Sequence, residues 1–142
     1  DLFAPFEARW HGEALVLDKW VALEATSRRA DTLQRVRSLL SHPGYNARNP
    51  NRVRSLVGAF ALANFARFHA ADGSGYAFVA DQVLALDAMN PQLAARVAGA
   101  FELWKRLPEP RRGRVAVELR RVAAAPALSP DVTEIVTRSL AD

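Results

Sequence analysis

Three pairs of a helix-capping residue and a proline do most to constrain what this chain can fold into. An asparagine or a serine precedes each proline, in Asn49-Pro50, Asn90-Pro91 and Ser129-Pro130. Such a side chain accepts a hydrogen bond from an amide that the first helical turn leaves unpaired, and proline at the next position has no amide to leave unpaired. The three pairs lie 41 and then 39 residues apart. They predict helix starts at a near-regular interval, as in a chain of repeated helix pairs.

Apolar residues recur at helical spacing between these starts. The stripe Val53, Leu56, Val57 and Phe60 follows the i, i+3, i+4, i+7 pattern of one helix face, and no segment shows a convincing two-residue alternation. We therefore predict an all-α fold, with stacked antiparallel helix pairs forming a curved, HEAT-like superhelical array of about 8–9 helices. Further stripes of this kind are Leu2, Phe6 and Trp10; Leu33, Val36 and Leu40; Tyr76, Val79, Val83 and Leu86; Leu93, Val97, Phe101 and Trp104; Val115, Leu119 and Val122; and Val132, Ile135, Val136 and Leu140.

Weaker helix-start and turn signals lie between these segments. Glu109-Pro110 is a fourth candidate start with a poorer cap, and the turns His42-Pro43-Gly44 and Asp72-Gly73-Ser74-Gly75 separate apolar stripes. Glycine at such turns supplies the positive φ that other residues avoid. We expect one domain over residues 1–142, because this length suffices to bury most of the apolar surface of one domain. The chain opens with Asp1, which suggests a piece cut from something longer or a processed product.

Composition narrows the class of protein. No apolar run approaches the ~18 residues of a membrane span, and no signal peptide is visible. Since there are no cysteines, disulfides, thiolate zinc sites and cysteine nucleophiles are excluded. The lack of cysteine also favours a reducing compartment, so we expect a cytoplasmic protein that does not bind a membrane.

The net charge of +4 raises the question of nucleic-acid binding. Seven basic residues fall between Lys105 and Arg121 against only Glu109 and Glu118, but no exposed aromatic residues are interleaved with them. We interpret this run as a solvated helix face and expect no nucleic-acid partner. The three tryptophans, Trp10, Trp20 and Trp104, all fall on apolar stripes and are expected in the core.

Candidate catalytic groups are few. The three histidines, His11, His42 and His69, form no pair with metal-ligand spacing, and no nucleophile elbow or phosphate-binding loop is present. His69, Asp72 and Tyr76 could suggest a catalytic cluster. We interpret His69 and Asp72 instead as bonding backbone amides around a turn formed with Gly73 and Gly75. No catalytic residue and no metal ligand is predicted.

Arg54 and Arg96 are the candidate binding residues. They follow Asn49 and Asn90 by five and six residues, so each lies in the second turn of a capped helix. If the two helices stack side by side, both guanidinium groups could line one surface, where they would suit a carboxylate such as a peptide C-terminus. The spacing is equally compatible with structural pairing to Asp or Glu. Arg52 falls on the side opposite the apolar stripe.

Two blocks of sequence are diagnostic. Residues 49–60, NPNRVRSLVGAF, and residues 68–76, FHAADGSGY, closely resemble the C-terminal domain of bacterial aminopeptidase N, a zinc metallopeptidase of the M1 (gluzincin) family. Residues 15–20, LVLDKW, and 90–92, NPQ, extend the resemblance over essentially the whole chain.

This resemblance implies an all-helical domain that closes over the catalytic domain and encloses a chamber where peptides lose their N-terminal residue. In that family a His-Glu-x-x-His motif with a downstream Glu holds zinc, and a Gly-x-Met-Glu-Asn motif binds the substrate amine. None of these motifs occurs here, so the parent would be the enzyme and this chain would carry no cofactor. Arg54 and Arg96 match arginines that face the chamber and can meet the C-terminal side of a peptide. The expected partners are peptides and the catalytic domain.

Two other readings stay open from the residues alone. A stand-alone helical-repeat module could use the same concave face to bind a protein partner. A nucleic-acid binder could use the basic run after Trp104. The residues encoded upstream of Asp1 discriminate the first of these from a peptidase domain, and salt dependence of binding tests the second.

Overall fold

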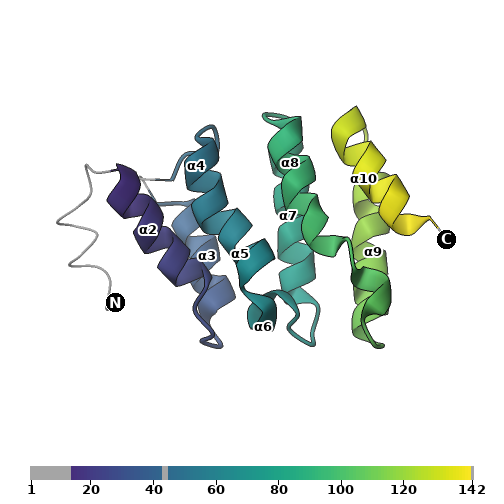
Figure 1. The fold of residues 1–142 in the computed structure, drawn as a ribbon, viewed down its shortest axis with the longest axis horizontal. Helices are drawn as coiled ribbons and strands as arrows, with labels where there is room; N and C mark the ends of the chain where they lie inside the picture. The colour runs from purple at the N-terminus through teal and green to yellow at the C-terminus, as the bar shows by residue number, and fades with distance from the viewer. Residues whose placement is uncertain (1–13, 43–44, 142) are drawn as a thin grey trace. The chain divides into compact units, whose positions relative to one another are not determined.

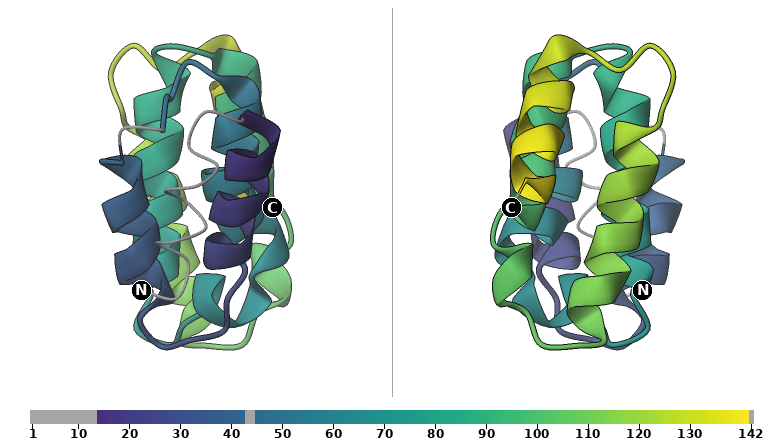
Figure 2. Two further views of the ribbon diagram at one scale, coloured as in Figure 1. Left: turned by 90° about the vertical axis from the view of Figure 1, so that its left-hand side faces the viewer. Right: turned by 90° about the vertical axis from the view of Figure 1, so that its right-hand side faces the viewer.

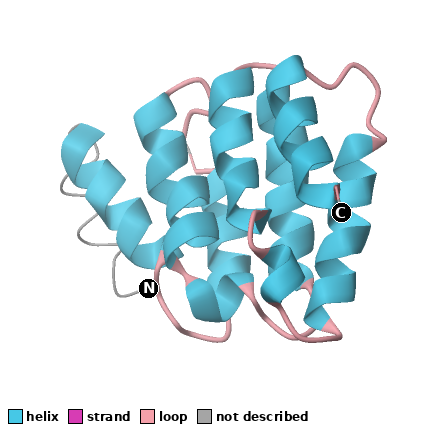
Figure 3. Cartoon of the chain, turned by 45° about the vertical axis from the view of Figure 1, so that its right-hand side comes forward, coloured by secondary structure: helices cyan, strands magenta, loops and turns pink. Residues whose placement is uncertain are grey.

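A computed structural model describes residues 14–42 and 45–141, and the chain divides into two compact units, Asp1–Arg67 and Phe68–Asp142. Throughout the described residues Figure 3 shows helices joined by loops, with no strand, so the predicted all-α class is confirmed. The expected stripe of Leu2, Phe6 and Trp10 lies outside the described residues, as does His11. Each unit is described by itself.

The first unit is built around α2 (Ala14–Ala25), α3 (Thr32–Leu40) and a longer helical run. This run consists of α4 (Pro50–Val53), the π-helical turn η1 (Arg54–Gly58) and α5 (Ala59–Ala63), and α6 (Phe65–Phe68) follows it. Helix α2 packs against α3, η1 and α5, as can be followed in Figure 1. The core of this unit comprises Leu17, Trp20, Val21, Ala25, Val36, Leu39, Val53, Leu56, Val57, Phe60 and Ala61.

The predicted start at Asn49 is confirmed. Its side-chain oxygen accepts from the amides of Asn51, at 3.1 Å, and Arg52, at 3.3 Å. The stripe Val53, Leu56, Val57 and Phe60 is fully buried. The sequence did not predict the π turn, in which the Ala59 amide donates to the Arg54 carbonyl five residues earlier. The apolar spacing of this stripe is that of an ordinary α-helix, so the pattern carried no signal of the extra residue in the turn.

The second unit contains α7 (Ser74–Asp87), α8 (Pro91–Ala98), α9 (Arg111–Ala123) and α10 (Pro130–Leu140), with short 3₁₀ turns η2 (Gly99–Phe101) and η3 (Trp104–Arg106). Helix α7 packs against α8 and α9, and α10 packs against the same two helices. The right-hand view of Figure 2 shows α9 and α10 side by side, with their connecting loop at one end. Asn90 and Ser129 cap α8 and α10 through the amides of Leu93 and Val132, which confirms both predicted starts.

Two predicted boundaries in this unit are wrong in detail. The stripe from Leu93 to Trp104 is not one helix, because α8 ends at Ala98; Trp104 is half-buried and its Nε1 donates to the Ser139 carbonyl at 2.8 Å. Helix α9 begins at Arg111, after Pro110 rather than at it.

The buried face of α3 also differs from the expected stripe. Thr32, Val36 and Leu39 are buried, whereas Leu33 and Leu40 are half-buried. The Thr32 hydroxyl donates to the Ser27 carbonyl at 2.9 Å, so a polar residue can occupy a fully buried position there.

No helix among the described residues combines the length and the apolar character needed to cross a membrane.

Candidate functional site

Arg54 opens the π turn of the first unit and is exposed. One guanidinium nitrogen, Nη1, donates to the side-chain oxygen of Asn51 at 3.2 Å, which lays the arginine along its own helix. Such π turns inside α-helices occur frequently at functional sites. The turn is therefore a second observation, independent of spacing, that distinguishes this arginine from the other exposed cations.

Arg96 lies in the last turn of α8 and is also exposed. Neither Arg96 nor Arg54 forms an ion pair with a carboxylate in the part of the chain that the structure describes. The alternative interpretation of the two as carboxylate-paired structural arginines therefore has no support there. Arg54 belongs to the first unit and Arg96 to the second, so each is placed only within its own unit.

Arg52 corrects the sequence interpretation. It was expected opposite the apolar face, but its residue is only 5% exposed. Its Nε donates to Oδ1 of Asp18 on α2 at 2.5 Å, and this ion pair compensates the burial of the charge. The signal that could have identified the partner was Asp18 itself, a carboxylate placed inside the apolar run LVLDKW.

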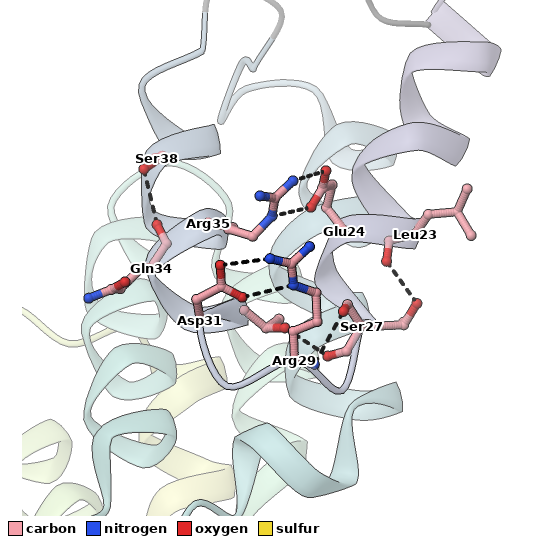
Figure 4. A network of polar contacts seen from close by, with 10 residues as sticks. Leu23, Glu24, Ser27, Arg29, Asp31, Gln34, Arg35 and Ser38 are labelled. Atoms are coloured by element: carbon pink, nitrogen blue, oxygen red, sulfur yellow. Dashed lines mark hydrogen bonds and ion pairs between the residues drawn. The ribbon is translucent and has the colours of Figure 1, made fainter. Parts of the chain in front are cut away.

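A second inward ion pair joins α2 to α3. Glu24, 3% exposed, accepts from Nε and Nη2 of Arg35, both at 2.7 Å, and this bidentate pair raises the pKa of Arg35. Figure 4 shows the pair beside the bidentate bonds of Arg29 to Asp31 at the turn between the helices. A pocket of about 190 Å³ is lined by Glu24, Arg35, Ser38 and Leu39. Sequence reasoning missed this network, because Glu24 and Arg35 are 11 residues apart on different helices.

The predicted turn cluster in the second unit is more specific than expected. Nδ1 of His69 and the hydroxyl of Tyr76 are hydrogen-bonded at 2.7 Å, and Tyr76 is fully buried. The Tyr76 ring also packs edge-on against Phe68, with centroids 5.1 Å apart. The Nδ1 atom of His69 is thus bonded to a side-chain hydroxyl, whereas a backbone amide was expected from sequence.

Burial dominates the acid–base properties of this pair. It lowers the pKa of His69, and the nearby Arg111 lowers it further. Burial raises the pKa of Tyr76, with Arg111 acting in the opposite direction. A neutral imidazole bonded to a buried phenol holds the start of α7 against the preceding turn. Because Tyr76 is fully buried, its hydroxyl is not accessible to a substrate.

Asp72 and Gly73 form the turn itself. The Asp72 carboxylate accepts from the hydroxyl of Ser74 at 2.7 Å and from its amide at 2.9 Å, and these bonds lower the pKa of Asp72. Gly73 has φ of 79°, and a Cβ there would lie 3.0 Å from Cδ of Arg114. Gly75 does not share the positive φ expected of it, because it lies in the first turn of α7.

Part of the basic run on α9 holds this turn in place. Arg111 donates from Nε to the His69 carbonyl at 2.8 Å, and Arg114 donates from Nη1 to the Asp72 carbonyl at 3.3 Å. Arg121 pairs with Asp81 on α7 and with Glu118 on its own helix. The run is therefore not only a solvated helix face, because three of its arginines bind groups of the second unit.

No group of three or more His, Asp or Glu side chains within residues 14–42 and 45–141 could hold a metal ion. Of the remaining histidines, His42 lies with its ring 5.5 Å from that of Trp20, and His11 is outside the described residues. The described residues therefore do not fit a zinc ion, and no step of a zinc-dependent reaction is assigned to them.

The chain is similar to known proteins over nearly all its length. Residues 1–141 match the family described as "Domain of unknown function (DUF3458_C) ARM repeats". The chain is 41% identical over 140 residues to aminopeptidase N of Escherichia coli (strain K12), covering 99% of this chain and 16% of that protein. It is 42% identical over 135 residues to aminopeptidase N of Caulobacter vibrioides, with 95% and 16% covered.

A solved structure agrees with these sequence relatives. The aminopeptidase A of Legionella pneumophila, solved in complex with aspartic acid, matches with a TM-score of 0.89 at 29% identity, over 96% of this chain and 16% of that one. The chain thus spans a small part of the relatives it matches. The ARM-repeat description agrees with the predicted stack of helix pairs and confirms that part of the fold. The chain belongs to the C-terminal ARM-repeat domain family (DUF3458_C) of bacterial aminopeptidases N, as its resemblance predicted.

Proposed function

We propose that residues 1–142 are the single, non-catalytic C-terminal domain of a zinc-dependent, cytoplasmic aminopeptidase that removes N-terminal residues from peptides. The observation that carries this proposal is the 41% identity to aminopeptidase N of E. coli over 99% of the chain, which accounts for only 16% of that protein. The zinc site and the hydrolytic chemistry would belong to the part of the enzyme outside this chain.

Within that enzyme, the domain packs against the catalytic domain, closes the active-site chamber and supplies secondary contacts to the peptide. Arg54 and Arg96 are the contact residues in this proposal. Both are exposed, and neither is neutralised by a carboxylate among the described residues. A guanidinium group in this state can bind the C-terminal carboxylate of a short peptide through charge-assisted hydrogen bonds.

The test is made in the complete enzyme with Arg54→Ala and Arg96→Ala. We expect kcat/KM for tri- and tetrapeptides to fall about fivefold for each variant, because a solvated charge contact contributes about 1 kcal/mol or less. An aminoacyl chromogenic amide, which has no C-terminal carboxylate, should respond much less. Arg106→Ala, which removes an exposed arginine of η3, is the control.

Equal losses on peptides and on the uncharged amide would show that carboxylate recognition is wrong. If the natural gene product has no His-Glu-x-x-His motif upstream of Asp1, the stand-alone helical-repeat interaction module would be favoured instead.

A further inference from the structure

The side chain that caps α4 is that of Asn49, and the side chain of Asn51 makes a different contact. The Asn49 oxygen accepts from the amides of Asn51 and Arg52. Asn51 is exposed, and its Oδ1 accepts from Nη1 of Arg54 at 3.2 Å. Because a guanidinium group only donates hydrogen bonds, the atom of the Asn51 side-chain amide that faces Arg54 is its oxygen. The second asparagine of the block NPN thus holds the arginine three positions later.

Arg54 is held by a neutral acceptor. Other arginines of the first unit are held by carboxylates, in the pairs Arg29–Asp31, Arg35–Glu24 and Arg52–Asp18. A carboxylate balances the charge of the guanidinium group that it binds, whereas the oxygen of an asparagine carries no full charge. Arg54 therefore keeps its positive charge and its other N–H donors while one nitrogen is held in place.

The backbone of Asn51 is fixed on both sides. Its amide donates to the Asn49 side chain at 3.1 Å. Its carbonyl accepts from the Ser55 hydroxyl at 2.9 Å and from the amide of Arg54, the residue at which the π turn begins. A long side chain loses rotamer freedom when it binds a ligand, and a contact that limits this freedom beforehand lowers the cost of binding. The bond from Arg54 to Asn51 is a contact of this kind.

The first unit also carries the net charge of the chain. Ten basic and six acidic residues fall in Asp1–Arg67, whereas nine basic and nine acidic residues fall in Phe68–Asp142. The whole net charge of +4 therefore comes from the first unit. An excess of positive charge attracts anions, so it favours an anionic ligand group at the exposed Arg54.

We propose that Asn51 is a positioning residue, which holds the guanidinium group of Arg54 in place to bind the C-terminal carboxylate of a peptide. This inference rests on the proposed function, because it specifies how the contact that Arg54 makes there is prepared. Gln92 follows the cap Asn90 by two residues, as Asn51 follows Asn49, and it is also exposed. In the described part of the chain, however, no hydrogen bond joins Gln92 to Arg96. Gln92 is therefore an internal comparison for Asn51.

The test uses the complete enzyme and two substrates, Ala-Ala-Ala-Ala with a free C-terminus and the same tetrapeptide with a C-terminal amide. The ratio of kcat/KM for the acid over the amide measures recognition of the carboxylate. We expect Asn51→Ala to lower this ratio about two- to threefold, through KM, because Arg54 is then less well positioned. Gln92→Ala is the matched control and should keep the wild-type ratio.

Asn51→Asp separates the positioning of Arg54 from the stability of the helix. A carboxylate in the first turn of a helical run stabilises its start, so the Tm should stay the same or rise. The same carboxylate would pair with Arg54 and balance its charge, so we expect the acid-over-amide ratio to fall about fivefold, as in Arg54→Ala. The double variant Asn51→Ala/Arg54→Ala should have the ratio of Arg54→Ala alone, because Asn51 acts through Arg54.

The inference is wrong if Asn51→Ala or Asn51→Asp keeps the wild-type ratio while Arg54→Ala lowers it, or if Gln92→Ala lowers the ratio as much as Asn51→Ala. It is also wrong if the losses of Asn51→Ala and Arg54→Ala add in the double variant, or if the ratio in Asn51→Asp falls only together with the Tm. A wild-type ratio in Arg54→Ala would refute the Arg54 contact itself, and this inference with it. The proposed aminopeptidase function fails separately, if the complete enzyme releases no N-terminal residue from either peptide.

Discussion

At the scale of single residues, Asp87 shows how one buried carboxylate fixes the start of a helix far along the chain. It ends α7, is 8% exposed, and accepts from the amide of Ser129 at 2.8 Å and from its hydroxyl. The same hydroxyl oxygen accepts from the amide of Val132 and so caps α10. The sequence predicted the cap, but only the packing of α7 reveals the residue that orients it.

We therefore expect Asp87→Ala to lower the free energy of unfolding by about 2–3 kcal/mol, because it leaves the partly buried amide and hydroxyl of Ser129 without their charged acceptor. Ser129→Ala should cost about 1 kcal/mol through loss of the cap, and the double variant should cost less than the sum. Urea unfolding, with hydrogen exchange at α10, measures these changes. Asp131→Ala, at an exposed position in the first turn of α10, is the control, and additive losses would contradict the coupling.

His69 gives a residue-scale prediction about pH. Its pKa in the folded protein is below the ordinary value of 6.5, so the unfolded chain binds a proton more readily. The stabilisation is therefore complete above about pH 6.5 and is lost as pH falls toward the folded-state pKa. His69→Gln should reduce the loss of thermal stability between pH 7 and pH 5 (roughly the interval in which histidine titrates). An unchanged pH dependence in the variant would show that other groups cause it.

At the scale of elements, residues close in sequence set where the helices begin, whereas contacts with other helices set where they end. The run from α4 to α5 starts at the cap of Asn49 and stops before Asn64, whose side chain is 3% exposed. The side-chain nitrogen Nδ2 of Asn64 donates to the carbonyl of Ala25, the last residue of α2, and to that of Ser27, two residues further on, both at 2.8 Å. One amide group thus connects the ends of two helices that are distant in sequence.

Asn64→Leu tests this connection. It should lower the free energy of unfolding by about 2–4 kcal/mol, because it takes the side-chain donor from the Ala25 carbonyl, removes one of the two donors to the Ser27 carbonyl and adds apolar bulk there. Asn46→Ala, which removes an exposed bond to the Arg48 amide, should cost much less. Hydrogen exchange at the last turn of α2 and at α5 locates the effect. Equal costs for the two variants would show that Asn64 does not hold the helix ends together.

At the scale of the whole molecule, the two units differ in net charge rather than in fold class. The second unit commits several cations to its own structure, including Arg111 and Arg114 at the turn before α7. The first unit commits Arg35 and Arg52 to the carboxylates of α2 and leaves Arg54 exposed. The net positive charge of the chain therefore comes from the residues before Phe68, because acidic residues of the second unit balance the basic run after Trp104.

The sequence by itself determined the helical class and three of the helix starts, because caps, prolines and apolar spacing act within one or two turns of the backbone. It also determined the family of this chain, through the blocks NPNRVRSLVGAF and FHAADGSGY. It could not determine which arginines face inward. Arg52 and Arg54 are two residues apart, yet one is buried on Asp18, 34 positions away in sequence, and the other is exposed. Only the tertiary structure decided between them, because an ion pair across helices depends on how those helices pack and on which carboxylate the packing brings within reach.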